Sequence, residues 1–283
     1  SFKKNGFLIR KNFLNFDEIK NVISAFLALC VRLGGDHFVG YSIEDFYKNK
    51  DFTQNLLDLR KKYPKKFGAI YDVMQTTVSM QKLALNKIIA DDIAILLKTK
   101  TTNLMCFNYL FRMDPPYCSR NSLDWHQDFV DYDQKDMSDG ITAWIPLVDI
   151  DNDIGPLRAL VGSHVGGKVT DYEILKDSKS ELASDKHKIS NDITSKYEQK
   201  NIPVNIGDII YISMNLIHAS GQNQSQKIAT THHQYCHTHG ANQFFLTESR
   251  LSLVKKSPAT AAIPTARHHG RFRCHLHKAG AVN

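Results

Sequence analysis

The chain has 283 residues, of which 42% are hydrophobic and 23% are charged, and this composition is typical of one soluble globular domain. No apolar run approaches the roughly 20 residues that a helix needs to cross a bilayer, and no signal peptide is apparent, so we expect a cytoplasmic protein without a membrane partner. The net charge of +7 comes almost entirely from residues 254–283, which hold six basic side chains and no acidic one. The nearly neutral remainder argues against a nucleic-acid partner.

The cysteines are odd in number and follow no disulfide framework, which favours free thiols in a reducing cytoplasm; they are Cys30, Cys106, Cys118, Cys236 and Cys274. The basic tail of residues 254–283 holds histidines around Cys274, but Ala, Pro and Gly interrupt them and no zinc-type spacing appears. We therefore expect one domain over residues 1–253, followed by a tail that is poorly ordered or docked at its periphery.

The part of the chain from about residue 15 to residue 98 predicts helices. Asn15, with Glu18 three residues later, has the form of a capping pair. Apolar residues then recur at helical spacing from Ile19 to Cys30, and Gly34-Gly35 ends the run. The pattern indicates one amphipathic helix.

Two longer helical stretches follow. The first covers about residues 43–63 and is ended by Pro64, and the second covers about residues 67–98, with a break near residues 86–91. We expect these helices to cover the outer face of a β-sandwich.

From about residue 102 the pattern changes to short strands separated by turns. In residues 103–113, Asn108 and Arg112 share one face with Leu104, Cys106 and Leu110, so the polar pair faces either a polar cavity or solvent. Further strands are predicted at residues 141–148, 157–161, 202–204, 208–213 and 227–237. Together they predict a mainly β fold, a double-stranded jelly roll of the cupin type over about residues 102–245.

Two loops interrupt these strands. Residues 131–139 form an acidic, turn-like loop, and residues 166–199 form a polar segment of mixed charge. A loop longer than about 12 to 15 residues in a compact domain is usually a functional lid or disordered. We therefore expect residues 166–199 to be a lid over the site.

A metal-ligand pattern lies in Asp124-Trp125-His126-Gln127-Asp128-Phe129. Side chains at i and i+2 of a β-strand point the same way, so His126 and Asp128 would share a face and Gln127 would oppose them. A second histidine from a neighbouring strand completes the 2-His-1-carboxylate set that holds Fe(II) with open positions, and His218 is the candidate. A surface histidine beside a solvated aspartate is the alternative interpretation.

Three blocks surround these residues in a fixed order, namely GITAWIPL at 140–147, GPLRALVGSH at 155–164 and GDIIYI at 207–212. In that order they resemble the phytanoyl-CoA dioxygenase family of Fe(II)/2-oxoglutarate oxygenases. The match is good over about residues 103–235 and looser over the helices, where residues 5–9 look like the family's opening strand.

The resemblance implies a hydroxylase that uses Fe(II), 2-oxoglutarate and O2 on a small-molecule substrate, with His126, Asp128 and His218 as iron ligands. It also places further side chains at the 2-oxoglutarate pocket, namely Gln127, Trp144 and Ser220, to which we add Asn108 and Arg112 from the preceding strand. Halogenating relatives lack the carboxylate ligand, and because Asp128 is present we reject halogenation.

One position departs from the family. The family places an arginine on the strand after the distal histidine, where its guanidinium pairs with the far carboxylate of 2-oxoglutarate, and that position here is Ala229. His233, Lys227 and Arg112 are possible substitutes. The departure keeps two other classes open, a non-catalytic metal-binding or ligand-binding jelly roll and a cupin-type metal enzyme without 2-oxoglutarate. The sequence does not define the substrate.

Overall fold

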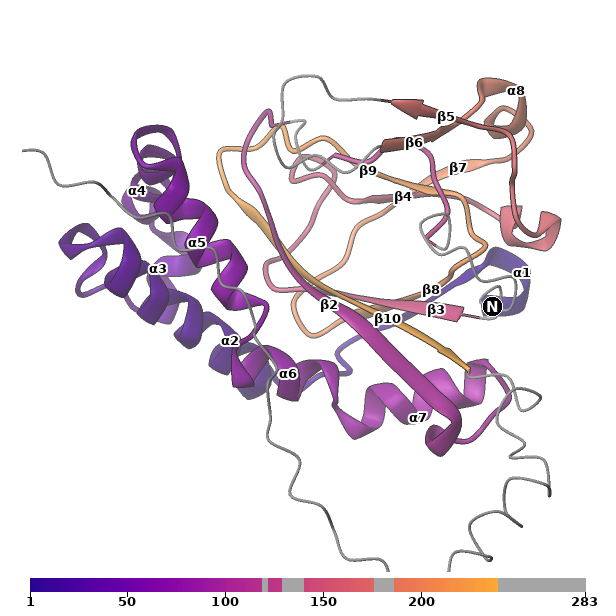
Figure 1. Cartoon of the computed structure of the whole chain (residues 1–283), viewed down its shortest axis with the longest axis horizontal. Helices are drawn as coiled ribbons and strands as arrows, with labels where there is room; N and C mark the ends of the chain where they lie inside the picture. Colours follow the sequence, from indigo (N-terminus) through magenta and orange to yellow (C-terminus); the bar gives the residue numbers. More distant parts are fainter. Residues whose placement is uncertain (119–121, 129–139, 176–185, 239–283) are drawn as a thin grey trace, which may run out of the picture. The chain divides into compact units, whose positions relative to one another are not determined.

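Helices and antiparallel sheets form separate layers in the part of the chain that the structure describes (Figure 1). This computed structural model describes residues 1–118, 122–128, 140–175 and 186–238, without the side chains of 107–109, 174, 175, 186 and 187. The described residues belong to one unit, Ser1–Gly240. Among them, no helix is both long enough and apolar enough to cross a bilayer.

The N-terminal half is mainly helical. The short helix α1 (Phe2–Asn5) passes through Gly6, whose φ of 81° lies in the left-handed region, into strand β1 (Phe7–Arg10). The helices that follow are α2 (Phe16–Leu29), α3 (Ile43–Lys48), α4 (Lys50–Lys62), α5 (Pro64–Met74), α6 (Val78–Ala84) and α7 (Lys87–Leu96).

The C-terminal half contributes the remaining strands. They are β2 (Leu104–Asp114), β3 (Gly140–Pro146), β4 (Leu157–Leu160), β5 (Tyr172–Leu175), β6 (Lys186–Ile189), β7 (Gln199–Ile202), β8 (Ile209–Ser213), β9 (His218–Ser220) and β10 (Ala229–Thr238), with a short helix α8 (Asn191–Thr194). A five-stranded sheet has the order β1-β8-β3-β10-β2, a three-stranded sheet the order β7-β4-β9, and β5 pairs with β6; the pairings are antiparallel.

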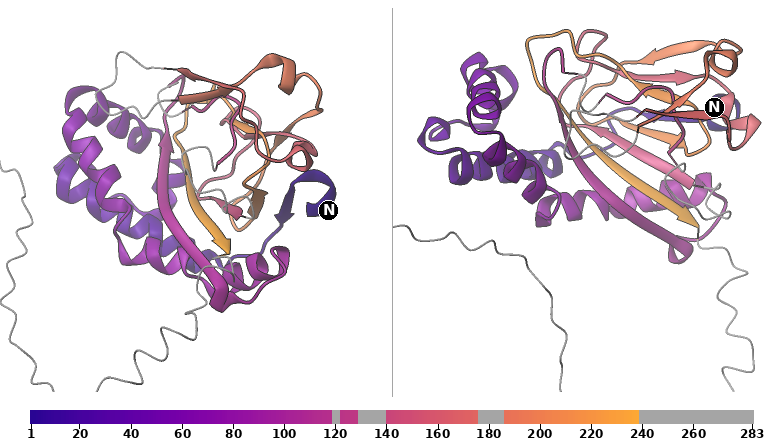
Figure 2. Two further views of the ribbon diagram at one scale, coloured as in Figure 1. Left: turned by 45° about the vertical axis from the view of Figure 1, so that its right-hand side comes forward. Right: turned by 45° about the horizontal axis from the view of Figure 1, so that its top comes forward.

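The five-stranded sheet buries both of its faces, and β3 shows how. Ile141, Ala143 and Ile145 pack into a core that they share with the helices, including Phe26 of α2. Trp144 on the other face packs into a second core that contains residues of the three-stranded sheet. This alternation follows from the two-residue period of a strand. The larger sheet is therefore a middle layer, with α2 to α6 against one face and the smaller sheet against the other (Figure 2). The expectation that helices cover the outside of a sheet is confirmed.

The helix boundaries differ from the prediction where side chains cap the backbone. Asn15 caps α2 by accepting from the N–H of Asp17, but Glu18 accepts from Asn86 instead of completing the capping box. The single helix expected over residues 43–63 is divided by Asn49, whose side chain accepts from the first N–H groups of α4. The break near residue 86 is confirmed, and a second break, between α5 and α6, was missed.

A bulge in β2 corrects the predicted distribution of side chains over its faces. His233 pairs with Leu110 but Tyr235 with Phe107, so β2 has one extra residue between these pairs. The extra residue reverses the alternation. Leu104 and Cys106 therefore pack on the helix side. The prediction that they share a face with Arg112 is wrong.

The bulge also brings Cys106 opposite Cys236 of β10, with Cα atoms 4.2 Å apart, and the structure joins the pair by a disulfide. The expectation of free thiols is wrong for these two cysteines and holds for Cys30 and Cys118. The spacing in sequence gave no sign of the bridge, because 130 positions separate its ends and only the strand register brings them together.

Residues 166–199 are not the structureless loop that was predicted. Within the described residues they contain the β5–β6 hairpin and α8. The N–H of Ile189 in β6 donates to the carbonyl of Trp125, next to the predicted metal ligands. The segment is thus attached beside the site, and its role as a lid stays a prediction. The acidic loop 131–139 and the tail 254–283 lie outside the described residues.

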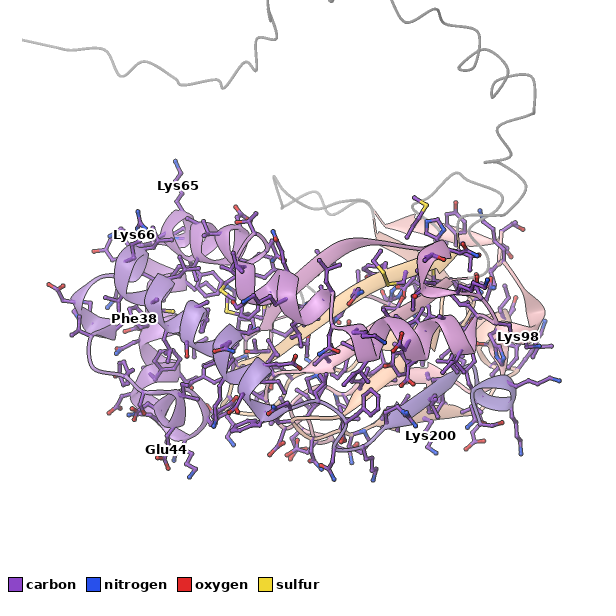
Figure 3. All side chains as sticks on the ribbon, turned by 90° about the horizontal axis from the view of Figure 1, so that it is seen from below. Phe38, Glu44, Lys65, Lys66, Lys98 and Lys200 are labelled. Carbon is purple, nitrogen blue, oxygen red and sulfur yellow. A yellow bond between two sulfur atoms is a disulfide. The ribbon has the colours of Figure 1, made fainter. Side chains whose placement is uncertain are left out.

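Basic side chains are distributed over different ends of the described unit. Lys65 and Lys66 project from α5 at one end, Lys98 lies at the other end, and Lys200 projects from the lower edge in that view (Figure 3). All four are exposed.

Candidate metal centre

Three side chains that are far apart in sequence converge at one point. The ring nitrogens Nε2 of His126 and His218 lie 3.6 Å and 3.4 Å from Oδ1 of Asp128. The ligand atoms of the three residues all lie within 4.8 Å of one another, which is close enough to hold one metal ion. Among the described residues, no other group of three or more His, Cys, Asp or Glu side chains meets this condition. Two imidazole nitrogens and one carboxylate oxygen on one side of an ion are the donor set of non-haem Fe(II) sites. The residues therefore fit iron.

Paired backbones bring the two histidines together. His126 and His218 form an isolated antiparallel bridge in which each N–H donates to the other's carbonyl, at 2.9 Å and 3.0 Å. Within residues 124–128 the regular pairing does not extend beyond this bridge, because Asp128 lies in a turn. The predicted convergence is correct, but the predicted strand through His126 and Asp128 is not.

Hydrogen bonds to the backbone orient both imidazoles. Nδ1 of His126 lies 2.7 Å from the carbonyl of Asp124, and Nδ1 of His218 lies 3.0 Å from the carbonyl of Leu216. Since a carbonyl only accepts, each Nδ1 carries a proton, which leaves Nε2 as the ring atom that faces Asp128 and is available to a metal. In the neutral ring this is the tautomer that a metal ligand through Nε2 needs.

Thr142 of β3 orients the carboxylate. Its hydroxyl donates a hydrogen bond to Oδ2 of Asp128, which leaves Oδ1 facing the histidines. Sequence reasoning did not identify Thr142. A signal was present, because Thr142 shares a strand face with Trp144, which had been placed in the pocket.

Burial and mutual charge shift the three ligands in different directions. Burial favours neutral Asp128, but the two histidines outweigh it and hold the pKa of the carboxyl well below its ordinary value. Burial and the neighbouring His218 lower the pKa of His126. For His218, burial is outweighed by the Asp128 carboxylate, so its pKa is raised. Without a metal, His218 is thus the ligand that takes up a proton beside Asp128.

Gln127 lies between two ligands but points elsewhere. Its amide nitrogen donates to the carbonyls of Gly167 and Asn215, at 2.9 Å and 2.6 Å, and its amide oxygen accepts from the N–H of Val169 at 2.8 Å. The side chain is only 2% exposed. Gln127 therefore connects the ligand segment to the two loops beside it, and its predicted contact with a co-substrate stays a prediction.

Ser220 and Arg112 meet next to the ligand strand. Ser220 Oγ accepts from the N–H of Leu123 and from Nη2 of Arg112, both at 3.1 Å. Nε of Arg112 donates to both carboxylate oxygens of Asp114, at 3.0 Å and 2.8 Å. The side chains of Arg112 and Asp114 are 13% and 24% exposed. The face of β2 that carries Arg112 is thus the face that lies beside β9, and the polar cavity expected there stays a prediction.

Trp144 and His233 lie on the same inner face of the sheet. Their rings are 5.8 Å apart, and Nε2 of His233 lies 3.1 Å from Oγ1 of Thr231. Trp144 is also part of the core between the two sheets. The backbone of Asn108 lies in β2, but its side chain lies outside the described residues.

Ala229 is buried in the core between the sheets and pairs directly with Asp114. Lys227 is exposed ahead of β10, which separates it from the buried site. Of the substitutes that the sequence suggested for the missing arginine, His233 and Arg112 lie near the centre and Lys227 does not.

A largely buried 2-His-1-carboxylate cluster on layered antiparallel sheets is typical of non-haem metal enzymes. The sequence model of the phytanoyl-CoA dioxygenase family, PhyH, matches residues 2–231, and the chain belongs to this family. No curated protein matches the chain.

Solved structures share the fold at low sequence identity. AviO1 from Streptomyces viridochromogenes Tue57 has a TM-score of 0.51 and 17% identity, covering 84% of this chain and 92% of its own. The epimerase SnoN in complex with Fe3+, alpha ketoglutarate and nogalamycin RO has a TM-score of 0.56 and 14% identity, covering 94% and 90%. The alpha ketoglutarate dependent carbocyclase SnoK from nogalamycin biosynthesis has a TM-score of 0.52 and 15% identity, covering 93% and 91%.

Proposed function

We propose that the protein is an Fe(II)/2-oxoglutarate-dependent oxygenase that hydroxylates a small-molecule substrate. The observation that carries this is the convergence of His126, Asp128 and His218, whose Nε2 and carboxylate oxygen atoms face one another, with Asp128 and His218 buried and His126 half-buried. Family membership supports it, because the family is a dioxygenase family. The paired sheets support a jelly roll, and we propose one domain over residues 1–253 with residues 254–283 as a tail.

Each residue of the centre has a distinct task in this proposal. His126 and His218 would bind iron through Nε2 and Asp128 through Oδ1, while Thr142 holds the second carboxylate oxygen and so fixes the carboxylate's direction. When bound, Fe(II) supplies the activation of O2 that is coupled to oxidative decarboxylation of 2-oxoglutarate. The core around Trp144 and Ala229 keeps water out of the space between the sheets.

The outcome of the reaction depends on how a substrate is placed. The solved relatives include an epimerase and a carbocyclase, so one fold supports several outcomes. We take hydroxylation as the function of this chain because no further group is needed for it. Ala229 favours a second candidate, a binding protein of the same fold that holds metal without turnover.

Anaerobic titration with Fe(II) and 2-oxoglutarate, followed by succinate measurement after O2 is admitted, tests the proposal. The unmutated protein should bind one Fe(II), take up 2-oxoglutarate and form succinate. His126→Ala should abolish stoichiometric Fe(II) binding, whereas His37→Ala, which removes an exposed histidine outside the site, should leave it intact. Stoichiometric Fe(II) without succinate would support the binding protein, and equal Fe(II) binding in both variants would exclude this centre.

A further inference from the structure

A dicarboxylic co-substrate needs a cation at the far end of its pocket, because a buried carboxylate without a counter-ion is costly. At the conventional position on β10 the chain has Ala229, which lies in an apolar core. The counter-ion of the distal carboxylate must therefore come from another position that faces the same space.

Arg112 meets this requirement by its position on the neighbouring strand. It pairs directly with Thr231 of β10. Its side chain therefore lies on the same face of the sheet as Ala229 and His233, one strand away from them. Its side chain is 13% exposed. A guanidinium on this face adjoins the same volume as one at position 229 would.

Arg112 is hydrogen-bonded to the strand that carries one of the metal ligands. Nη2 of Arg112 lies 3.1 Å from Ser220 Oγ, and Ser220 lies two residues beyond His218 in β9. Two residues of a strand span about 6.6 Å. The carbon chain of 2-oxoglutarate spans about 5 Å from end to end, given C–C bonds of about 1.5 Å. The two lengths are similar, so a co-substrate bound at the metal ligands would extend along β9 toward Ser220 and the guanidinium.

The positive charge of Arg112 acts on His233. Burial lowers the pKa of His233 well below its ordinary value, and the positive charge of Arg112 acts in the same direction. Arg112 is thus close enough to His233 on the same face of the sheet to interact with it electrostatically.

Asp114 determines how strong this anchor is. It accepts from Nε of Arg112 with both carboxylate oxygens, which fixes the guanidinium with its Nη side toward Ser220. The same carboxylate offsets part of the guanidinium charge. An anchor held in this way binds a carboxylate directionally but more weakly than an arginine without an acidic neighbour.

Resting on the proposed function, we propose that Arg112, oriented by Asp114 and flanked by the hydroxyls of Ser220 and Thr231, binds the distal carboxylate of 2-oxoglutarate in place of the arginine that is absent at position 229. The positive charge has moved from β10 to β2 without leaving the inner face. Arg112 therefore determines whether the pocket prefers a dicarboxylic 2-oxo acid over a monocarboxylic one.

The test compares dissociation constants for 2-oxoglutarate and 2-oxobutyrate, which lacks the distal carboxylate, measured anaerobically by calorimetry on the Fe(II)-loaded protein. In Arg112→Met the dissociation constant of 2-oxoglutarate should rise at least about tenfold, the loss of a charge-assisted hydrogen bond. The constant of 2-oxobutyrate should stay within about twofold. Arg112→Lys keeps the charge without the two-pronged guanidinium. Its dissociation constant for 2-oxoglutarate should lie between those of the unmutated protein and Arg112→Met.

Asp114→Asn provides the opposite change, and the double variant Arg112→Met/Asp114→Asn removes the unpaired carboxylate that the single variant leaves. Asp114→Asn should tighten 2-oxoglutarate by about threefold or more while leaving 2-oxobutyrate unchanged. The double variant should match Arg112→Met in selectivity. Fe(II) binding and thermal unfolding of each variant identify any loss that comes from misfolding.

The outcomes separate this inference from the proposed function. Equal 2-oxoglutarate binding in Arg112→Met and the unmutated protein, with 2-oxoglutarate still preferred over 2-oxobutyrate, would overturn the assignment of Arg112 and leave the oxygenase intact. Parallel loss of both 2-oxo acids would also overturn it, because the arginine would then be structural. Failure of the unmutated, Fe(II)-loaded protein to bind either acid would refute the proposed function itself.

Discussion

Replacing Gln127 by alanine should weaken the fold and the metal centre together. Its amide makes three hydrogen bonds to the backbones of Gly167, Asn215 and Val169, and it is almost fully buried. A hydrogen bond contributes about 1 kcal/mol net, and these three backbone groups are only partly buried, so water can replace some of the lost bonds. We expect Gln127→Ala to lower the free energy of unfolding by about 2 kcal/mol, less than the full sum of the three bonds.

The same change should reduce Fe(II) affinity, because Gln127 fixes the backbone between His126 and Asp128. Groups that hold a ligand in place typically contribute about 10- to 100-fold to metal affinity. Urea unfolding of the metal-free protein and anaerobic Fe(II) titration measure the two effects separately. Gln222→Ala, which removes an exposed glutamine, serves as the matched control.

A Gln127→Ala protein with unchanged unfolding midpoint and Fe(II) affinity, but with a large loss of 2-oxoglutarate affinity, would refute this reasoning. It would show that the amide contacts the co-substrate, as its position in the sequence motif suggested.

Two further predictions concern single buried groups. Thr142→Val keeps the shape of the side chain but removes the hydrogen bond to Asp128, so Fe(II) affinity measured by anaerobic titration should fall about 10- to 100-fold, and unchanged affinity would contradict the role assigned to Thr142. Burial lowers the pKa of His232 to about 3, whereas an unfolded histidine titrates near 6.5, so between these values the unfolded chain binds the extra proton and stability falls as the pH falls. His232→Leu should therefore reduce the loss of unfolding free energy between pH 6.5 and pH 5 by about 2 kcal/mol in urea titrations, and an unchanged pH dependence would contradict it; His37→Leu is the control.

The sequence by itself determined the elements that depend on local pattern. The spacing of apolar residues predicted α2, and Asn15 was identified as its cap because capping needs only neighbouring residues. The run of strand-forming residues predicted a strand at 141–148, which the structure has as β3. The motif residues His126, Asp128 and His218 were also found in the sequence, since side-chain chemistry and the order of blocks need no coordinates.

Contacts between distant segments required the tertiary structure. The bulge in β2 reverses which side chains face the helices, and one extra residue in a strand leaves no signal in periodicity. The same register joins Cys106 to Cys236 across 130 positions. Strand parity placed Gln127 opposite the ligands but could not show which backbone groups it binds.

The candidate anchor for the co-substrate depends on such contacts most of all. From sequence, Ala229 indicated a missing charge, while Arg112 was one of three possible substitutes. The structure separates them because sheet order sets Arg112 beside Thr231 and because Ser220, 108 positions away, receives its Nη2 hydrogen bond. A local pattern can name the residue types that a site needs. Which of them share one volume is decided by strand pairing and burial, since these fix distances between residues that the sequence does not relate.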